Sequence, residues 1–137
     1  MKPIALSPTL EVSRLIYGWW RLMSWNMSAA DIVARIEACL ELGISTHDHA
    51  DIYGAYQVEP SFGAALKTAP ALRNRIQLIS KCGIKLVSDA RPQHARKAYD
   101  TSANHIMLSV ETSLKNLHTD YLDVLLIHRP DPLMNAD

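Results

Sequence analysis

The 137-residue chain carries 14 basic and 14 acidic residues, so its formal net charge is zero, and 48% of its residues are hydrophobic. This composition is typical of one globular domain with a core and excludes a disordered segment, while the balanced charge gives no support for a nucleic-acid or membrane partner. No apolar run reaches the roughly 18 residues of a spanning helix and the N-terminus does not resemble a signal peptide, so we expect a cytoplasmic protein with a small-molecule partner.

Two elements are predicted in the first third of the chain. After a turn-rich lead-in over residues 3–10, residues 11–20 carry the first strand, which Gly18 is expected to end. Ser28 is a favourable N-cap, and an acidic residue three positions later can complete a capping box. Apolar residues then recur at helical spacing until Gly43, which predicts a helix with one apolar face between these two residues.

The same alternation repeats in the middle of the chain. Residues 44–48 are too few for a helix after a glycine stop and predict a second strand, and residues 59–66 predict a second helix with a proline in its first turn. Residues 76–81 predict a third strand. Residues 84–100 are polar and aperiodic, and a connection of this length usually lines a functional site.

A third helix and a fourth strand complete the pattern. Ser102 can cap a helix whose apolar residues recur at spacings of three and four. Residues 122–128 form an almost continuous apolar run, which is typical of a strand covered on both faces. Strands and helices therefore alternate along the whole chain without internal repeats or a linker, which predicts one parallel α/β domain over residues 1–137.

Residues that can carry chemistry follow the ends of successive predicted strands. In chain order they are Gly18 with Trp19 and Trp20, then Asp48, then Lys81, then His128. Function at the carboxyl ends of consecutive parallel strands is typical of a (β/α) barrel. The densest stretch is residues 47–54, His-Asp-His-Ala-Asp-Ile-Tyr-Gly, in which Tyr53 follows Asp48 by five positions. We expect this stretch to open into a reaction cleft.

These motifs resemble those of the aldo/keto reductases. Residues 48–54 resemble the family pattern Asp-x-Ala-x-x-Tyr-Gly, residues 79–83 its third-strand lysine motif and residues 121–128 its fourth-strand histidine motif. The likeness is greatest to bacterial NADPH-dependent reductases with Ser-Lys-Cys-Gly-Ile and Ile-His-Arg-Pro-Asp-Pro at these places. The resemblance implies a (β/α)8 TIM barrel, and because such a barrel usually needs about 250 residues, residues 1–137 would be its N-terminal half with four or so βα units.

The resemblance also implies a reaction, the reduction of an aldehyde or ketone to an alcohol with NADPH as cofactor. Tyr53 would give the carbonyl oxygen its proton, and because an ordinary tyrosine has a pKa of about 10, Lys81 would supply the cation that such an acid needs. Asp48 would hold the Lys81 ammonium, and His128 would orient the carbonyl. The expected cofactor-binding residues are Gly18, Trp19, Trp20 and Asp48, with at most one of the two indoles facing the pocket.

The second half of the family's barrel is absent from this chain. In the family, most residues that hold the dinucleotide phosphates and stack on the nicotinamide follow the fifth, seventh and eighth strands. We therefore expect the 137-residue chain alone to be inactive. Four parallel strands also leave two open edges and an uncovered apolar face, which predict self-association.

Two alternatives from other classes stay open. His47 and His49 at a strand end also resemble the paired histidines of metal-dependent barrel hydrolases, although strand parity places both on the face opposite Asp48 and a lysine is a poor metal ligand. The chain could instead be a reductase-like fragment or pairing module without catalysis. Taken singly, each candidate residue also has an ordinary structural role as a turn cap, a solvated strand end or a core side chain.

Overall fold

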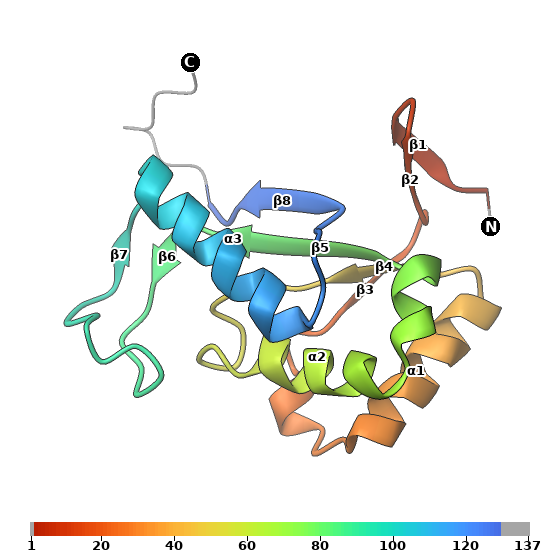
Figure 1. Ribbon diagram of the computed structural model, residues 1–137, viewed down its shortest axis with the longest axis horizontal. Helices are drawn as coiled ribbons and strands as arrows, with labels where there is room; N and C mark the ends of the chain where they lie inside the picture. The colour runs from red at the N-terminus through yellow and green to blue at the C-terminus, as the bar shows by residue number, and fades with distance from the viewer. Residues whose placement is uncertain (1, 130–137) are drawn as a thin grey trace.

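The computed structural model describes residues 2–129, and its centre is a four-stranded parallel sheet (Figure 1). The strands are β3 (Ile16–Gly18), β4 (Thr46–Asp48), β5 (Gln77–Cys82) and β8 (Val124–Ile127). They lie in the order β3-β4-β5-β8, which is also their order along the chain. The predicted parallel α/β architecture with consecutive strands is confirmed, and the carboxyl ends of all four strands meet at one edge of the sheet.

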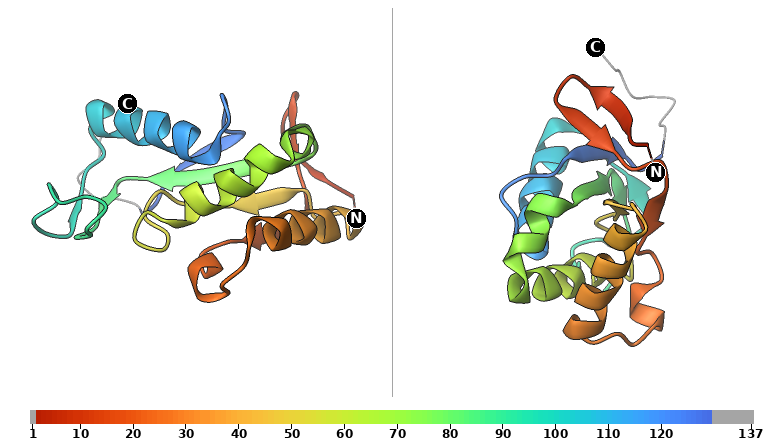
Figure 2. Two further views of the ribbon diagram at one scale, coloured as in Figure 1. Left: turned by 60° about the horizontal axis from the view of Figure 1, so that its bottom comes forward. Right: turned by 90° about the vertical axis from the view of Figure 1, so that its right-hand side faces the viewer.

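Three α-helices cover one face of this sheet (Figures 1 and 2). They are α1 (Ala29–Glu41), α2 (Val58–Thr68) and α3 (Ala103–Leu117). The predicted helix starts are confirmed, because the Ser28 side chain accepts from the Asp31 backbone in a full capping box and Ser102 caps α3. The helices α2 and α3 lie so close that a Cβ on Gly63 would overlap the Asn116 carbonyl oxygen.

The N-terminal residues differ from the prediction. A β-hairpin of β1 (Ile4–Ser7) and β2 (Leu10–Val12) replaces the expected turn-rich lead-in, and the expected strand over residues 11–20 is interrupted before β3. The interruption has a local cause: the Ser13 backbone N–H donates to Thr46 Oγ1, and the Thr46 N–H donates to Ser13 Oγ. Side-chain hydrogen bonds here replace ladder bonds, so the chain leaves one sheet and enters the next.

Residues 84–100, called the 84–100 connection below, also contain structure that was not predicted. Strands β6 (Ile84–Lys85) and β7 (Ala98–Tyr99) pair antiparallel at its base, and Lys85 forms an ion pair with Asp100. The residues between β6 and β7 extend beyond the carboxyl ends of the sheet strands (Figure 1). The connection is therefore a hairpin with a long loop.

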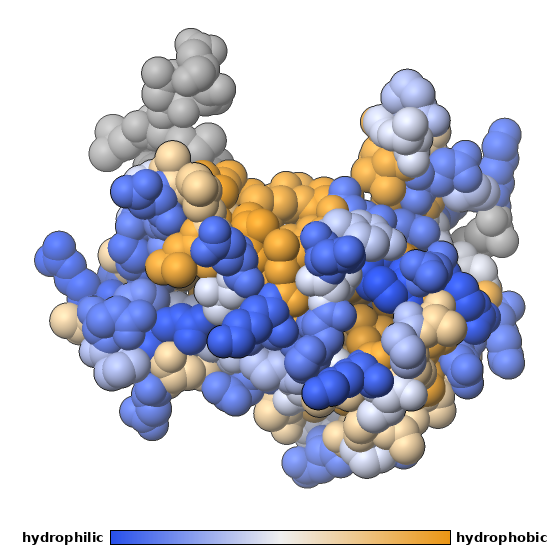
Figure 3. Space-filling view, viewed as in Figure 1, coloured by the Kyte–Doolittle hydropathy of each residue, from blue (hydrophilic) through white to orange (hydrophobic). Residues whose placement is uncertain are grey.

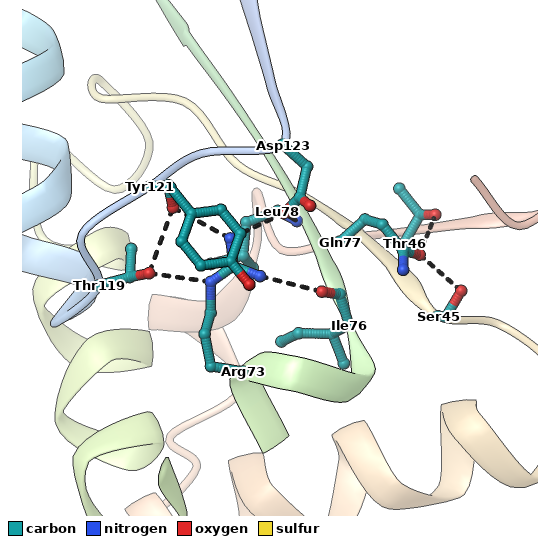
Figure 4. A network of polar contacts seen from close by, with 9 residues as sticks. All are labelled: Ser45, Thr46, Arg73, Ile76, Gln77, Leu78, Thr119, Tyr121 and Asp123. Atoms are coloured by element: carbon teal, nitrogen blue, oxygen red, sulfur yellow. Dashed lines mark hydrogen bonds and ion pairs between the residues drawn. The ribbon is translucent and has the colours of Figure 1, made fainter. Parts of the chain in front are cut away.

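Two 3-10 helices complete the fold, η1 (Leu22–Ser24) and η2 (Pro70–Arg75), and the second of them carries a buried cation. The Arg73 guanidinium donates to Asp123 Oδ2 (2.8 Å), to the Tyr121 and Ile76 carbonyl oxygens (both 3.0 Å) and to Thr119 Oγ1 (2.9 Å) (Figure 4). This network lies at the end of the sheet where β5 and β8 begin, and it ties η2 to the segment between α3 and β8.

The sheet buries one face and leaves apolar surface on β8. The core between sheet and helices contains fully buried Trp19, Ile36, Phe62, Leu78 and Leu117. In contrast, hydrophobic side chains are exposed where Figure 1 draws β8 (Figure 3), including Leu125 and Leu126. The expectation of a strand covered on both faces is therefore wrong for residues 2–129. None of the helices among these residues has the length and hydropathy to cross a membrane.

Candidate functional site

The Lys81 ammonium is the centre of a polar cluster at the carboxyl ends of β4 and β5. Its Nζ donates to Asp48 Oδ1 (2.6 Å), to the Tyr53 hydroxyl oxygen (3.0 Å) and to the His49 carbonyl oxygen (2.8 Å). The Lys81 side chain is 14% exposed and that of Asp48 is 25% exposed. The predicted placement of Lys81 between Asp48 and Tyr53 is observed.

The strand register explains why these side chains meet. Asp48 is aligned with Ile79 on the neighbouring strand, so Lys81 stands one pleat further along on the same face. That face is turned away from the helices. Backbone bonds from the His49 N–H to the Ile79 oxygen and from the Asp51 N–H to the Lys81 oxygen continue the ladder beyond the strand end. The lysine and the aspartate are thus fixed by main-chain pairing.

Tyr53 and His128 form the open side of the cluster. The Tyr53 hydroxyl also donates a long bond to Asp48 Oδ2 (3.4 Å), and the Lys81 Nζ lies 4.9 Å from the centre of the phenol ring. His128 meets Tyr53 edge to face, with 5.7 Å between ring centres. The four predicted catalytic residues therefore come together at one edge of the sheet.

The electrostatic environment favours a neutral His128. Partial burial, with the positive charges of Lys81 and Arg129, lowers the pKa of His128 below its ordinary value, and the Asp48 carboxylate opposes this only in part. His128 Nδ1 is buried and has no hydrogen-bond partner among the described residues. A neutral imidazole can serve as a donor or an acceptor toward a bound molecule.

Tyr53 is followed by an unusual left-handed turn. Gly54, Ala55 and Tyr56 have φ angles of +57°, +53° and +71°. For residues with a side chain this conformation costs about 1–2 kcal/mol each. A Cβ on Gly54 would also crowd the Met23 side chain, at 2.5 Å from its Cγ, so both the backbone conformation and the packing favour glycine there.

The three residues expected at the cofactor lie in different environments. Trp19 is fully buried and donates its indole N–H to His47 Nδ1 (3.0 Å), so its side chain belongs to the core and cannot touch a ligand in this structure. Trp20 is 62% exposed, and the space beside Gly18 is open, with no atom within 4 Å of a Cβ built there. Only one of the two indoles is accessible, as expected, but not because of strand geometry, since β3 ends at Gly18 and both tryptophans lie beyond it. The expectation that Trp19 contacts the cofactor is wrong for this structure.

The paired histidines considered as metal ligands lie in the core. His47 and His49 are fully buried on the helix-facing side of the sheet, where His49 stacks on Trp19 with 5° between the ring planes. Burial lowers the pKa of His47 to about 4 and that of His49 well below its ordinary value. The described residues contain no group of three or more His, Cys, Asp or Glu side chains able to hold a metal ion. This placement gives the hydrolase alternative no support.

Two buried carboxyl groups lie behind the cluster. Glu59 is 1% exposed and accepts from the Ser80 hydroxyl (2.6 Å), and burial raises its pKa. Burial and the nearby Glu59 charge raise the pKa of Asp51 to about 7. Asp51 also lines a cavity of about 250 Å³ between the 84–100 connection and α3. Sequence reasoning assigned neither group a role at the site.

Two contacts, one within the cluster and one beside it, had not been predicted. The His49 carbonyl that binds Lys81 is a backbone acceptor, and no residue type marks such an acceptor in a sequence. The second contact is from Tyr56, whose hydroxyl accepts from the Leu86 N–H (2.8 Å) and so joins the turn after Tyr53 to the 84–100 connection. The length of that connection had indicated that it lines a site, but not that it contacts Tyr56.

The arrangement can perform acid–base chemistry on a bound molecule. A phenol, an ammonium and a carboxylate lie in a chain of hydrogen bonds, beside an imidazole and an open strand end. A phenol held by a cation can transfer a proton to a developing oxyanion and take it back. The cluster is therefore suited to reactions in which a carbonyl oxygen takes up or loses a proton.

Comparisons with known proteins agree with this description. The model of the aldo/keto reductase family matches residues 14–135. The oxidoreductase YcsN of Bacillus subtilis is 54% identical over 137 residues, which are 100% of this chain and 46% of that protein. A 6-dehydroglucose reductase of Agrobacterium fabrum is 50% identical over 138 residues, again 100% of this chain and 46% of the relative.

A solved structure gives the same fold. The putative aldo-keto reductase PA4992 of Pseudomonas aeruginosa superposes with a TM-score of 0.74 at 30% identity, covering 95% of this chain and 48% of that one. The chain therefore spans about half the length of the relatives that it matches, and its four parallel strands are part of a TIM barrel. The chain belongs to the aldo/keto reductase family.

Proposed function

We propose that this chain carries the proton-donating part of the active site of an NADPH-dependent reductase that converts an aldehyde or ketone into an alcohol. The observation that carries the proposal is the position of the Lys81 ammonium, 3.0 Å from the Tyr53 hydroxyl and 2.6 Å from Asp48. Lone tyrosines and lysines at strand ends are common, but a shared contact that includes both and a carboxylate supports a functional role.

The residues have complementary roles. Tyr53 gives its proton to the carbonyl oxygen of the substrate, and Lys81 stabilises the phenolate that remains. Asp48 and the His49 carbonyl hold the ammonium in place, so that its charge faces the phenol. His128, kept neutral by the lowered pKa, hydrogen-bonds to the carbonyl and orients it for reaction.

When bound, NADPH would supply the hydride that is added to the carbonyl carbon. The described residues fit one side of such a cofactor, because Gly18 leaves open space at the end of β3 and Trp20 presents an exposed indole beside it. Asp48, which is one-quarter exposed, completes this side. Trp19 has no part in it, since its side chain is buried.

We also propose that residues 1–137 are the N-terminal half of a cytoplasmic barrel enzyme and that they are inactive alone. A hydride donor must be held at near-attack distance, and a misplacement of about 1 Å can cost about a hundredfold in rate. Residues 2–129 form only one side of a binding site for such a donor. A non-catalytic pairing module is the competing proposal, and it predicts no activity even when the barrel is complete.

A chimaera tests the proposal. Residues 1–137 replace the matching segment of Bacillus subtilis YcsN, which is 54% identical to them and supplies the remaining length. The chimaera should consume NADPH in the presence of an aldehyde, as followed by absorbance, while the 137-residue chain should not. Tyr53→Phe should lower the rate by at least about 100-fold and leave the NADPH affinity, measured by fluorescence titration, nearly unchanged.

Tyr99→Phe is the matched control, since Tyr99 is a half-exposed tyrosine on β7. A chimaera that shows no carbonyl-dependent turnover would favour the pairing module. Retention of more than a few per cent of the parent rate in Tyr53→Phe would exclude Tyr53 as the acid.

A further inference from the structure

Tyr56 ends the left-handed turn and is held from a distant part of the chain. It is 4% exposed, its hydroxyl accepts from the Leu86 N–H (2.8 Å), and His94 Nδ1 lies 3.4 Å from the same oxygen. The Arg91 guanidinium covers the ring, with its carbon 4.7 Å from the ring centre. Burial raises the pKa of Tyr56, so the hydroxyl stays protonated at neutral pH.

The turn that Tyr56 ends closes directly on the backbone of Tyr53. The Tyr53 carbonyl accepts from both the Gln57 and the Val58 N–H groups at 3.2 Å. A second tie from the 84–100 connection runs from the Ser88 hydroxyl to the Ala55 carbonyl (3.3 Å). Residues with side chains remain in the left-handed region only where surrounding contacts hold them. Here those contacts come from the connection.

We propose that Tyr56 is a positioning residue for the proton transfer: its hydroxyl anchors the 84–100 connection and holds the left-handed turn that keeps the Tyr53 phenol beside Lys81. This inference rests on the proposed function, since it assigns Tyr53 the role of acid. It makes the 84–100 connection part of the active-site apparatus. Small shifts of the turn should change the rate strongly, because proton donation depends on the 3.0 Å contact of the Tyr53 oxygen with Lys81.

The test compares three variants in the chimaera. Tyr56→Phe keeps the ring and removes the hydroxyl, and His94→Ala weakens the same anchor from the other side. Both should lower kcat by about tenfold and leave the KM values for NADPH and carbonyl within about twofold, because binding groups are untouched. Ala55→Gly added to Tyr56→Phe should restore part of kcat, since glycine adopts the left-handed conformation freely. Tyr121→Phe is the control here, because Tyr121 is an exposed tyrosine outside the 84–100 connection.

Two outcomes overturn the proposal. An unchanged kcat in both Tyr56→Phe and His94→Ala would show that the anchor does not act on Tyr53. A loss of kcat that Ala55→Gly does not relieve would show that the effect does not pass through the turn. A general loss of packing would give that result.

A separate readout distinguishes this inference from the proposed function. In the 137-residue chain, hydrogen exchange at the Leu86 amide should be faster in Tyr56→Phe than in the parent, because that N–H loses its acceptor. If exchange is unchanged, the anchor itself is absent and the inference fails. If exchange accelerates but Tyr53→Phe keeps the activity of the chimaera, the proposed function fails and the positioning role fails with it.

Discussion

Replacing Arg73 by methionine should lower the free energy of unfolding of the 137-residue chain by about 3–5 kcal/mol. Methionine keeps an apolar stem of similar length and deletes the guanidinium. The Arg73 and Asp123 side chains are only 10% and 15% exposed, so the carboxylate that remains has little access to water. It would keep its bond from the Leu78 N–H (2.8 Å), but two carbonyl oxygens and a hydroxyl would also lose their donor.

Urea unfolding followed by circular dichroism measures this loss. Arg75→Met is the matched control, because Arg75 is an exposed arginine in the same 3-10 helix, and it should change the stability by less than about 0.5 kcal/mol. Adding Asp123→Asn to each chain gives a double-mutant cycle, in which Arg73 and Asp123 should couple by at least about 1 kcal/mol. A loss below about 1 kcal/mol for Arg73→Met would refute the view that this buried network holds η2 against β5 and β8.

Two further predictions concern pH and association. Because the pKa of Asp51 is raised to about 7, the folded chain keeps a proton that the unfolded chain has lost above about pH 4; this stabilisation is full at lower pH and is lost as the pH rises through about 7. Asp51→Asn should therefore flatten the fall of the urea midpoint between about pH 4 and pH 7, and an equal fall in both chains would contradict this. The chain should also self-associate through β8, so light scattering should show a smaller average mass for Leu126→Lys but not for Leu42→Lys, an exposed leucine at the end of α1; a monomeric parent chain would exclude this surface.

Local signals in the sequence were sufficient for most of the fold. The capping box at Ser28 and the apolar periodicity after it depend only on neighbouring residues, and the structure has the helix where they placed it. Strand parity likewise separated His47 and His49 from Asp48, and the two faces of the sheet differ as expected. Family motifs then added the expectation that Lys81 and Asp48 would meet.

The failures involve contacts between segments far apart in the chain. The break after β2 depends on Ser13 bonding to Thr46, 33 positions away, and no local pattern in residues 11–20 reports it. The hairpin within the 84–100 connection is stabilised at its base by Lys85 and Asp100, whose pairing is not visible from either residue alone. Burial of Trp19 against the core, and not its spacing, decided which indole remained accessible.

The positions of Asp48, Lys81 and His128 relative to the sheet predict how firmly each is held. Asp48 ends β4 and Lys81 is the last residue but one of β5. Both strands are paired on both sides, and the ladder between them continues through His49 and Asp51. His128 follows β8, whose outer edge has no strand beside it among residues 2–129, and its backbone is fixed by one bond to Cys82. Edge strands open more readily than inner strands, because fewer hydrogen bonds must break. The positions of Asp48 and Lys81 are therefore set by this part of the barrel, whereas the position of His128, which we propose orients the carbonyl, depends on whatever packs against β8.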